Sequence, residues 1–373
     1  MSTGRLTSSD HDGIGIVNFL QGNNFFITGA TGFLGKVLVE KILRSTPNVG
    51  KIFLLVRGKD KEEAKIRVKN EIVDVALFKS LKKTHGNLFG DFITSKLIPV
   101  VGNVGEPNLG LDTITTREIA EEIDVIVNSA ANTTWDERYD VLRNTNAKGP
   151  ARVLEFAKKC KKLKLLLHVS TDQILCSYGQ GQLPGFAADP NTVPGDMVVN
   201  AIIAIMAKHG TTPSPTIKPE EHKRYNLYVY QIASSVANPL PIGDMLKYAY
   251  DQFTSSPLLD STGKKKIGIS PFKFSDSVDS LSCYLRNHTN NLDATKQTER
   301  VIRWAQLYQP YTFIKARFDM ENIKNLMREM SVVEMNDFGF VVESIDWENY
   351  FKRIHLPGLR RHALKEPPAR ARL

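Results

Sequence analysis

The chain has 373 residues, 42% of them hydrophobic and 24% charged, with a formal net charge of +9 at pH 7. This length allows one large hydrophobic core or two moderate ones, and the composition is typical of a soluble globular protein. The positive charge suits a polyanionic small ligand or an anionic membrane surface. We expect no nucleic-acid partner, because the basic residues are scattered and no recognition motif accompanies them.

We expect neither a signal peptide at the start of the sequence nor a membrane-spanning segment within it. Residues 1–24 lack the charged start and apolar run of a signal peptide, and the most apolar stretch, Met197 to Ala207, is too short to cross a bilayer. Cys160, Cys176 and Cys283 show neither metal-ligand nor disulfide spacing, which is typical of free thiols in a reducing compartment. We therefore expect an intracellular protein of the cytoplasm or the endoplasmic-reticulum surface. The final Ala-Arg-Leu also matches a peroxisomal address, a match that three residues reach easily by chance.

The most informative segment is Phe25 to Gly35, which reads FFITGATGFLG and precedes a helical pattern to about Leu43. A short apolar strand followed by three glycines and a helix predicts a dinucleotide phosphate site. Gly29 permits the sharp turn, Gly32 lets the backbone approach the pyrophosphate, and Gly35 lets the helix pack on the sheet. The alternative is a glycine-rich turn without a ligand. The predicted contacts of the nucleotide here are Thr28, Gly29, Thr31, Gly32, Phe33, Leu34 and Gly35.

A second apolar strand, Lys51 to Val56, ends in Arg57-Gly58-Lys59. NAD sites usually place a carboxylate at this point for the ribose 2′-hydroxyl, whereas an arginine accommodates a 2′-phosphate. Arg57 therefore favours NADPH over NADH. The alternative is that Arg57 is a solvated surface charge.

Further apolar strands alternate with helical stretches up to about residue 171. The expected strands are Leu97 to Gly102, Asp124 to Ala131 and Lys162 to Thr171, and the expected helices are Lys61 to Leu81, Thr115 to Ile123 and Asp136 to Lys161. This alternation predicts a Rossmann-like, doubly wound parallel α/β sheet, with its ligand crevice at the carboxyl ends of the strands. Asn103, Ala130, Ala131 and Ser170 stand at those ends, so we expect them to line the crevice with the glycine turn.

The pattern changes after the fifth strand. Loop-rich sequence leads to an apolar helix near Asp196 to Lys208, a strand-like stretch from Asn226 to Ile232 and a helix from Pro241 to Phe253. Two more helices are expected around Asp319 to Met330 and Ile345 to Lys352. We predict a nucleotide-binding domain over residues 1–175 and a smaller, mostly helical substrate or cap region over residues 176–373.

Several motifs together resemble the plant alcohol-forming fatty acyl-CoA reductases, which are extended short-chain dehydrogenases related to the male-sterility proteins. They include TGATGFLGKVLVEKILR, VVGNVGEPNLGL, NSAANTTWDERYD, NTNAKGP and HVST in the first half, and VPGDMVVNA, YNLYVYQIASSVANPL, LYQPYTF and IHLPGLRRHALK in the second. The resemblance covers nearly the whole chain. It implies an oxidoreductase of lipid metabolism that uses NADPH to reduce a long-chain acyl-CoA to a primary fatty alcohol through an aldehyde. The basic character leaves a peripheral membrane contact open.

The resemblance also implies a catalytic set that this chain does not complete. Chemistry of this kind needs a hydroxyl near the carbonyl oxygen and a tuned proton donor. In the family the hydroxyl ends the fifth strand, here Ser170 or Thr171, and the donor is a Tyr with a Lys four residues later on the next helix. The first tyrosine after this strand is Tyr178, and position 182 is glutamine. We therefore expect a sheet truncated after its fifth strand, with the catalytic helix missing and activity impaired.

The remaining candidates have structural alternatives. Tyr311 and Lys315 have the right spacing but stand 141 residues past Ser170 and are expected to be structural. His168 reads as a satisfied core residue rather than a base. Asn146 either orients backbone near the serine or lies on a helix surface, and the Trp135-Asp136 pair either borders the pocket or caps a helix. Two other functions stay open: a non-catalytic NADPH-binding or partner-binding relative, and another extended short-chain enzyme such as an epimerase, which would need the same Tyr and Lys.

Overall fold

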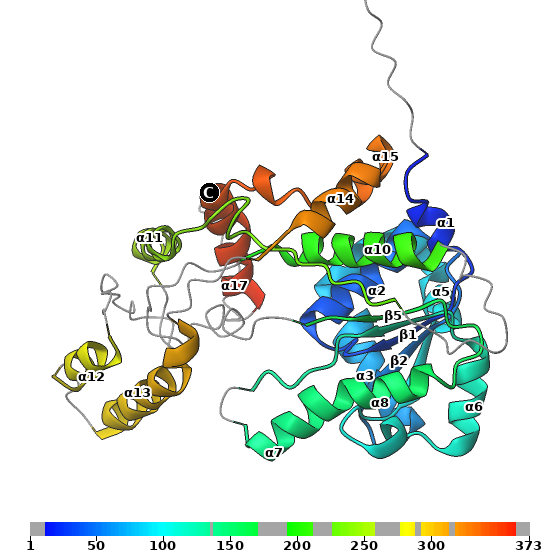
Figure 1. Cartoon of the computed structure of the whole chain (residues 1–373), viewed down its shortest axis with the longest axis horizontal. Helices are drawn as coiled ribbons and strands as arrows, with labels where there is room; N and C mark the ends of the chain where they lie inside the picture. Colours follow the sequence, from blue (N-terminus) through cyan, green and yellow to red (C-terminus); the bar gives the residue numbers. More distant parts are fainter. Residues whose placement is uncertain are drawn as a thin grey trace, which may run out of the picture. The chain divides into compact units, whose positions relative to one another are not determined.

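The computed structural model describes residues 12–134, 137–170, 192–211, 226–257, 277–287, 292–312 and 318–362. The chain divides into two compact units (Figure 1). The first unit comprises Met1–Thr171, Pro194–Tyr230 and Met320–Phe340. The second unit comprises Asp172–Val193, Gln231–Asp319 and Val341–Leu373.

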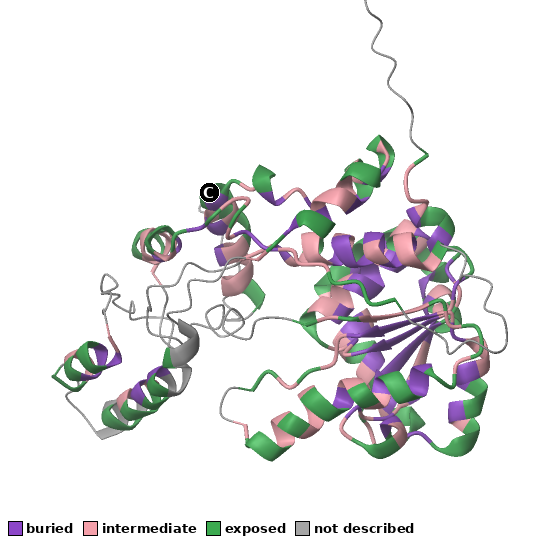
Figure 2. Ribbon diagram, viewed as in Figure 1, coloured by how far each residue is buried: buried purple, intermediate pink, exposed green. Residues whose placement is uncertain are grey.

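The first unit is built on a parallel sheet. Its strands are β1 (Phe25–Thr28), β2 (Ile52–Val56), β3 (Leu97–Val101), β4 (Val125–Asn128) and β5 (Leu165–His168), in the order β3-β2-β1-β4-β5. All four pairings are parallel. The side chains of β1, β2 and β4 are buried on both faces (Figure 2), which explains why these strands read as continuous apolar runs. The sheet confirms the predicted doubly wound α/β fold.

Helices and short turns connect and cover the strands of this unit. They are α1 (Ile16–Leu20), α2 (Phe33–Ser45), α3 (Lys61–Val68), η1 (Lys69–Val73), η2 (Ala76–Phe78), α4 (Lys79–His85), η3 (Gly86–Leu88), α5 (Phe89–Lys96), η4 (Pro107–Gly110), α6 (Thr113–Glu122), α7 (Tyr139–Leu142), η5 (Arg143–Ala147), α8 (Lys148–Ala157), α10 (Gly195–Thr211), α14 (Glu321–Glu329) and α15 (Val332–Phe338). Of these, η1 and η5 are π-helical turns and η2, η3 and η4 are 3₁₀ turns.

The two faces of the sheet have different covers. On one face, α6 and α8 pack over a core that contains Phe26 and Phe156, whose ring centroids are 4.9 Å apart. Helix α10 packs against α1, α2 and β5 (Figure 1). A β-carbon on Gly210 of α10 would lie 3.1 Å from the side chain of Leu165, so this helix comes close to the first residue of β5.

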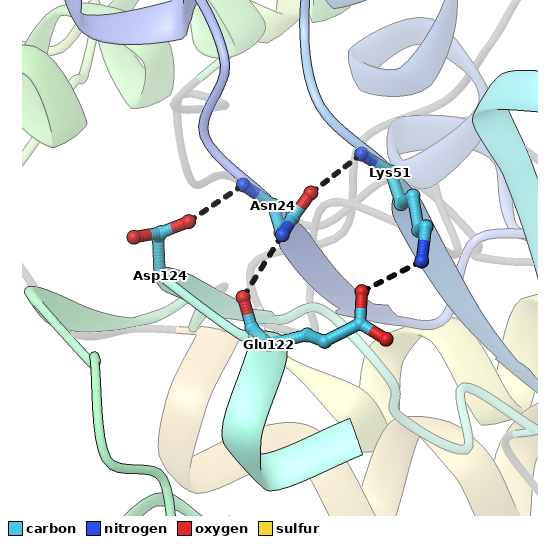
Figure 3. Close-up of polar contacts among 4 residues, drawn as sticks. All are labelled: Asn24, Lys51, Glu122 and Asp124. Carbon is cyan, nitrogen blue, oxygen red and sulfur yellow. Dashed lines mark hydrogen bonds and ion pairs between the residues drawn. The ribbon is translucent and has the colours of Figure 1, made fainter. Parts of the chain in front are cut away.

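The amino ends of three strands are tied by a polar network, shown in Figure 3. Asn24, just before β1, donates its backbone N–H to Asp124 at 2.9 Å and its side-chain amide to the carbonyl of Glu122 at 3.0 Å. Its side-chain oxygen accepts the backbone N–H of Lys51 at 2.7 Å, and the Lys51 ammonium binds Glu122 at 2.7 Å. One asparagine therefore fixes the starts of β1, β2 and β4 at the edge opposite the carboxyl ends.

The second unit is helical in its described residues. It contains α11 (Ile242–Ser255), α12 (Val278–Asn287), α13 (Leu292–Thr312), η6 (Val342–Ser344), α16 (Trp347–Asn349), η7 (Tyr350–His355) and α17 (Leu356–His362). A core of Leu240, Met245, Trp347, Phe351 and Leu356 joins α11 to the last helices, and α12 packs on α13. The helix expected from Pro241 is confirmed, with Pro241 at its N-cap.

Three expectations differ from the structure. Asn226 to Ile232 is not a strand: these residues have no regular secondary structure, and the carbonyl of Val229 accepts a side-chain hydrogen bond from Asn322. The helix expected over 61–81 is broken, because Val75 adopts an extended conformation with ψ 159°. The structure also groups the chain differently from a division after residue 175, since α10, α14 and α15 belong to the unit of the sheet.

Candidate functional site

The turn after β1 has a backbone conformation that requires glycine. Gly29 has φ +73°, and a β-carbon there would lie 2.7 Å from the backbone nitrogen of Ala130. Gly32 donates its N–H to the carbonyl of Gly29 at 3.0 Å and is the N-cap of α2. The first turn of α2 offers N–H groups without carbonyl partners inside the helix, an arrangement that suits a phosphate.

The third glycine brings α2 onto this turn. A β-carbon on Gly35 would lie 2.4 Å from the carbonyl oxygen of Gly29, so only glycine allows the observed packing. Thr31 and Leu34 are half-buried, whereas Phe33 is 73% exposed. A β-carbon on Gly195 would lie 2.6 Å from the Phe33 ring, which places this aromatic side chain against the start of α10.

A row of three side chains crosses the carboxyl ends of β1, β4 and β5. Thr28, Asn128 and His168 occupy matching register positions on the three strands. The Thr28 hydroxyl donates to Asn128 Oδ1 at 2.6 Å, and Asn128 Nδ2 lies 3.0 Å from His168 Nδ1. Because an amide nitrogen only donates, His168 Nδ1 is the acceptor in this contact.

This row gives Thr28 two hydrogen-bond partners, while its contact with a nucleotide stays a prediction, and it corrects the expectation for His168. Thr28 is fully buried, and its hydroxyl also accepts the backbone N–H of Ala130 at 3.1 Å. Its side chain therefore links the glycine turn to the segment after β4. His168 is exposed and bonded to Asn128, so the expectation of a core histidine is wrong; β5 lies at the edge of the described sheet and does not bury its last residue.

The segment after β4 is held by an asparagine pair. Asn146, on η5, accepts the backbone N–H of Asn132 at 2.8 Å and donates to its carbonyl at 2.9 Å. Asn146 thus orients the backbone of Asn132 in the segment after β4. Its expected place near Ser170 stays a prediction. In this segment Ala130 is half-buried and Ala131 is exposed. Trp135 and Asp136 lie outside the described residues.

The segment after β3 is fixed both by its own residues and by two side chains from η5 and α8. Asn103 accepts the N–H of Gly105 at 2.9 Å, and its own N–H binds the carbonyl of Leu109 at 2.8 Å. Asn144 donates to the Gly105 carbonyl at 2.6 Å, and Arg152 donates to Asn144 Oδ1 at 2.7 Å. The structure therefore gives the Asn103 side chain a role in shaping this loop. Sequence reasoning missed Asn128, Asn144 and Arg152, whose partners lie on other elements.

The end of β5 carries the predicted hydroxyl. Ser170 is exposed two residues beyond the strand, and Thr171 lies outside the described residues. The strand itself is unusual for a parallel sheet, because Leu165, Leu166 and Leu167 are only half-buried. In the described part of the chain, β5 pairs with β4 alone.

Arg57 follows β2 and is exposed. Its carbonyl accepts a hydrogen bond from Arg67 at 2.7 Å. The adjacent Lys59 donates its N–H to Glu63 at 2.9 Å, and Asp60 caps α3 by accepting the N–H of Glu63 at 2.8 Å. The structure thus places a cationic side chain at the carboxyl end of β2, on a tightly bonded segment.

The described residues offer neither a metal cluster nor a membrane-spanning helix. They contain no group of three or more His, Cys, Asp or Glu side chains able to hold a metal ion. None of their helices combines the length and the apolar character that crossing a membrane requires. Burial raises the pKa of the half-buried Cys160 thiol to about 12, so this cysteine is a poor nucleophile.

Comparison with known families identifies two matching regions. A model of an NAD-binding domain described as male sterility protein matches residues 27–182, and a second male sterility protein model matches residues 273–366. Fatty acyl-CoA reductase 2, chloroplastic, from Arabidopsis thaliana is 35% identical over 95% of this chain and 80% of its own length. The alcohol-forming fatty acyl-CoA reductase of Simmondsia chinensis is 26% identical over 94% of this chain and 99% of its own.

Solved structures show the same fold. The terminal reductase domain of the myxalamid biosynthetic pathway matches with a TM-score of 0.60 at 16% identity, over 94% of this chain and 93% of that domain. A reductase domain of a non-ribosomal peptide synthetase from Mycobacterium tuberculosis matches with a TM-score of 0.51 over 92% of this chain and 95% of that domain, also at 16% identity. These likenesses concern the fold alone.

Proposed function

Because the chain belongs to the fatty acyl-CoA reductase family, we propose that it binds NADPH and descends from enzymes that reduce a long-chain acyl-CoA to a primary alcohol through an aldehyde. We further propose that this chain has lost most of that activity. Substrate binding is assigned to its C-terminal region, where the second male sterility model matches residues 273–366. A peripheral membrane contact and a reducing intracellular compartment remain part of the proposal.

One observation carries this proposal: the nucleotide turn is complete, whereas the catalytic set beside it is not. Gly29 has the positive φ, and Gly35 the close approach, that a dinucleotide turn needs. Ser170 stands beyond β5, but the next tyrosine, Tyr178, has glutamine and not lysine four residues later, and the one Tyr-x-x-x-Lys match begins 141 residues past Ser170. The chain therefore keeps the means to bind the nucleotide and lacks the expected proton donor.

The preference for NADPH is supported by the end of β2. Arg57 occupies the position where NAD sites place a carboxylate, and its exposed guanidinium can pair with a 2′-phosphate. In a complete site the nicotinamide cofactor supplies the hydride. This chain's own residues would bind the pyrophosphate at the first turn of α2 and offer the Ser170 hydroxyl to the carbonyl oxygen.

The loss of activity is supported by three further facts. A positioned general acid contributes roughly a hundredfold to ten-thousandfold to such a reaction, and the one Tyr-x-x-x-Lys match, Tyr311 to Lys315, begins on α13 in the second unit. The alignment with the Arabidopsis relative runs over 502 residues, more than this chain contains, so the relative holds residues without a counterpart here. The leucines of β5 are only half-buried, whereas strands of a parallel sheet are normally covered on both faces. This partial burial is consistent with the loss of structure that would cover β5.

The test uses the purified full chain. We expect NADPH to bind in a fluorescence titration, while incubation with NADPH and a long-chain acyl-CoA yields no alcohol above background by gas chromatography. Robust alcohol formation would show that the activity survives. A failure to bind either NADPH or NADH would refute the nucleotide site itself and with it the proposal.

A further inference from the structure

The segment that presents Arg57 is fastened to α3 by two side chains of that helix. Glu63 accepts the backbone N–H of Lys59 at 2.9 Å. Arg67, one turn further along, donates Nη1 to the carbonyl of Arg57 at 2.7 Å. These two bonds hold the backbone on both sides of Gly58, a residue that would otherwise give the segment freedom.

Arg67 is itself held by a second residue. Its Nε donates to Glu71 Oε1 at 2.7 Å and its Nη2 to Glu71 Oε2 at 3.1 Å, which is a bidentate fork between guanidinium and carboxylate. The Arg67 side chain is only 24% exposed, so it cannot swing freely into solvent. With Nε and Nη2 bound to Glu71, Nη1 is directed at the Arg57 carbonyl. The Arg67 guanidinium therefore holds the backbone of Arg57 in place.

Several positive charges act on the Glu71 carboxylate of this fork. The hydrogen bond from Arg67 lowers the pKa of Glu71, against partial burial, and the positive charges of Lys36 and Arg57 add to the effect. Glu71 thus remains ionised near neutral pH and keeps its ion pair with Arg67. The Arg57 guanidinium lies close enough to this carboxylate to interact with it electrostatically.

We infer that Arg67 and Glu71 are positioning residues that set the preference for NADPH over NADH, because they fix the backbone from which Arg57 reaches the 2′-phosphate. This inference rests on the proposed coenzyme. Fixing the segment in advance lowers the entropy lost when the Arg57 side chain engages the phosphate. NADH lacks that phosphate, so its binding does not depend on this arrangement. Arg67 and Glu71 therefore change the ratio of the NADPH and NADH affinities.

The experiment measures dissociation constants of NADPH and NADH for the full chain and its variants. Arg57→Ala is expected to weaken NADPH binding roughly tenfold to hundredfold and to leave NADH nearly unchanged. Arg67→Gln is expected to weaken NADPH roughly threefold to tenfold, again with little effect on NADH. Lys65→Gln is the matched control, because Lys65 lies on the same helix and pairs with Glu62 at 2.7 Å.

Two additional variants separate position from charge. Arg67→Lys keeps the positive charge but cannot form the fork and the carbonyl bond together, so we expect a loss of NADPH affinity close to that of Arg67→Gln. In the double variant Arg57→Ala with Arg67→Gln, the loss should equal that of Arg57→Ala alone, since Arg67 acts through Arg57. Thermal unfolding of each variant checks that the fold is retained.

The outcomes distinguish a failure of the NADPH preference from a failure of the positioning role of Arg67. If Arg57→Ala leaves NADPH binding unchanged, the proposed coenzyme preference is wrong. If Arg57→Ala weakens NADPH but Arg67→Gln behaves like Lys65→Gln, or weakens both coenzymes equally, the positioning role is wrong. The positioning role would also be overturned if Arg67→Lys kept the wild-type preference for NADPH over NADH. Additive losses of NADPH affinity in the double variant would overturn it as well.

Discussion

Glu334 and Gly15 are joined by a 2.8 Å hydrogen bond, although 319 residues separate them in the sequence. The same buried carboxylate accepts the N–H groups of Ile14 and Ile16, each at 3.0 Å, and of Ser331 at 2.9 Å. Burial opposes the ionisation of Glu334, but these four N–H groups outweigh it and lower its pKa. One side chain therefore caps α1 and α15 together.

Glu334→Gln should destabilise the first unit by about 2–3 kcal/mol near neutral pH, because an amide offers one acceptor oxygen and turns an N–H group towards backbone donors. The folded-state pKa of Glu334 is below its ordinary value of 4.5. Its contribution is therefore fully present above that value and is lost as the pH falls through the folded-state pKa. Denaturant unfolding should show a constant gap between wild type and variant at neutral pH that narrows in acid.

The matched control for this prediction is Glu62→Gln, on an exposed carboxylate that pairs with Lys65 at 2.7 Å. We expect its effect to stay within about 0.5 kcal/mol at every pH. Equal stability of Glu334→Gln and wild type, or a gap that persists unchanged into acid, would contradict the role assigned to Glu334.

Thr28→Val tests the row of side chains across the carboxyl ends of the strands. The substitution keeps the shape of Thr28 but leaves Asn128 Oδ1 without the hydroxyl that donates to it at 2.6 Å, and the N–H of Ala130 without its acceptor. We expect a loss of about 1–3 kcal/mol in unfolding free energy and weaker nucleotide binding. In Thr94→Val, which removes an exposed hydroxyl bonded to the Gly90 carbonyl, the change should be much smaller. Similar losses in both variants would mean that the row has no special importance.

Gly32 and Gly35 of the turn should respond differently to alanine. A β-carbon on Gly35 would lie 2.4 Å from the Gly29 carbonyl, so Gly35→Ala should destabilise the fold as well as abolish nucleotide binding. Gly32 has an ordinary φ of −74°, and its β-carbon would lie 3.1 Å from the same carbonyl. Gly32→Ala should therefore fold nearly normally and lose nucleotide affinity, because the methyl group occupies the path to the pyrophosphate. Unimpaired binding in a titration of folded Gly32→Ala would show that this glycine is structural.

The sheet could be predicted from the sequence because its information is local. Apolar runs such as Lys51 to Val56 and the glycine spacing from Gly29 to Gly35 define strands, turn and helix without reference to distant residues. The stretch from Asn226 to Ile232 shows the limit of such reasoning. Its residues have strand-like composition, but no described strand lies beside them, and the structure pairs Val229 with a side chain of α14 instead.

The hydrogen bonds that hold the candidate site together could not be predicted from local sequence. Asn128 and His168 meet only because β4 and β5 pair in one register, which brings together residues 40 positions apart. Asn146 has no local signal that points to Asn132, and the Arg67 contact with the Arg57 carbonyl depends on how α3 returns along β2. Sequence reasoning finds the residues that carry a motif, and it misses those whose role comes from tertiary contacts.

The last prediction concerns the segment after Thr171. Inserting the corresponding segment of a family relative, with its Tyr-x-x-x-Lys, should restore turnover of acyl-CoA by roughly a hundredfold to ten-thousandfold, because it returns a general acid beside Ser170. The insertion should also stabilise the first unit by covering the half-buried leucines of β5. The same insert with Phe in place of that tyrosine should keep the added stability without the turnover, and Tyr311→Phe should leave the restored activity unchanged. If the Phe insert is as active as the Tyr insert, or if Tyr311→Phe abolishes activity, the missing tyrosine is not the reason for the impairment.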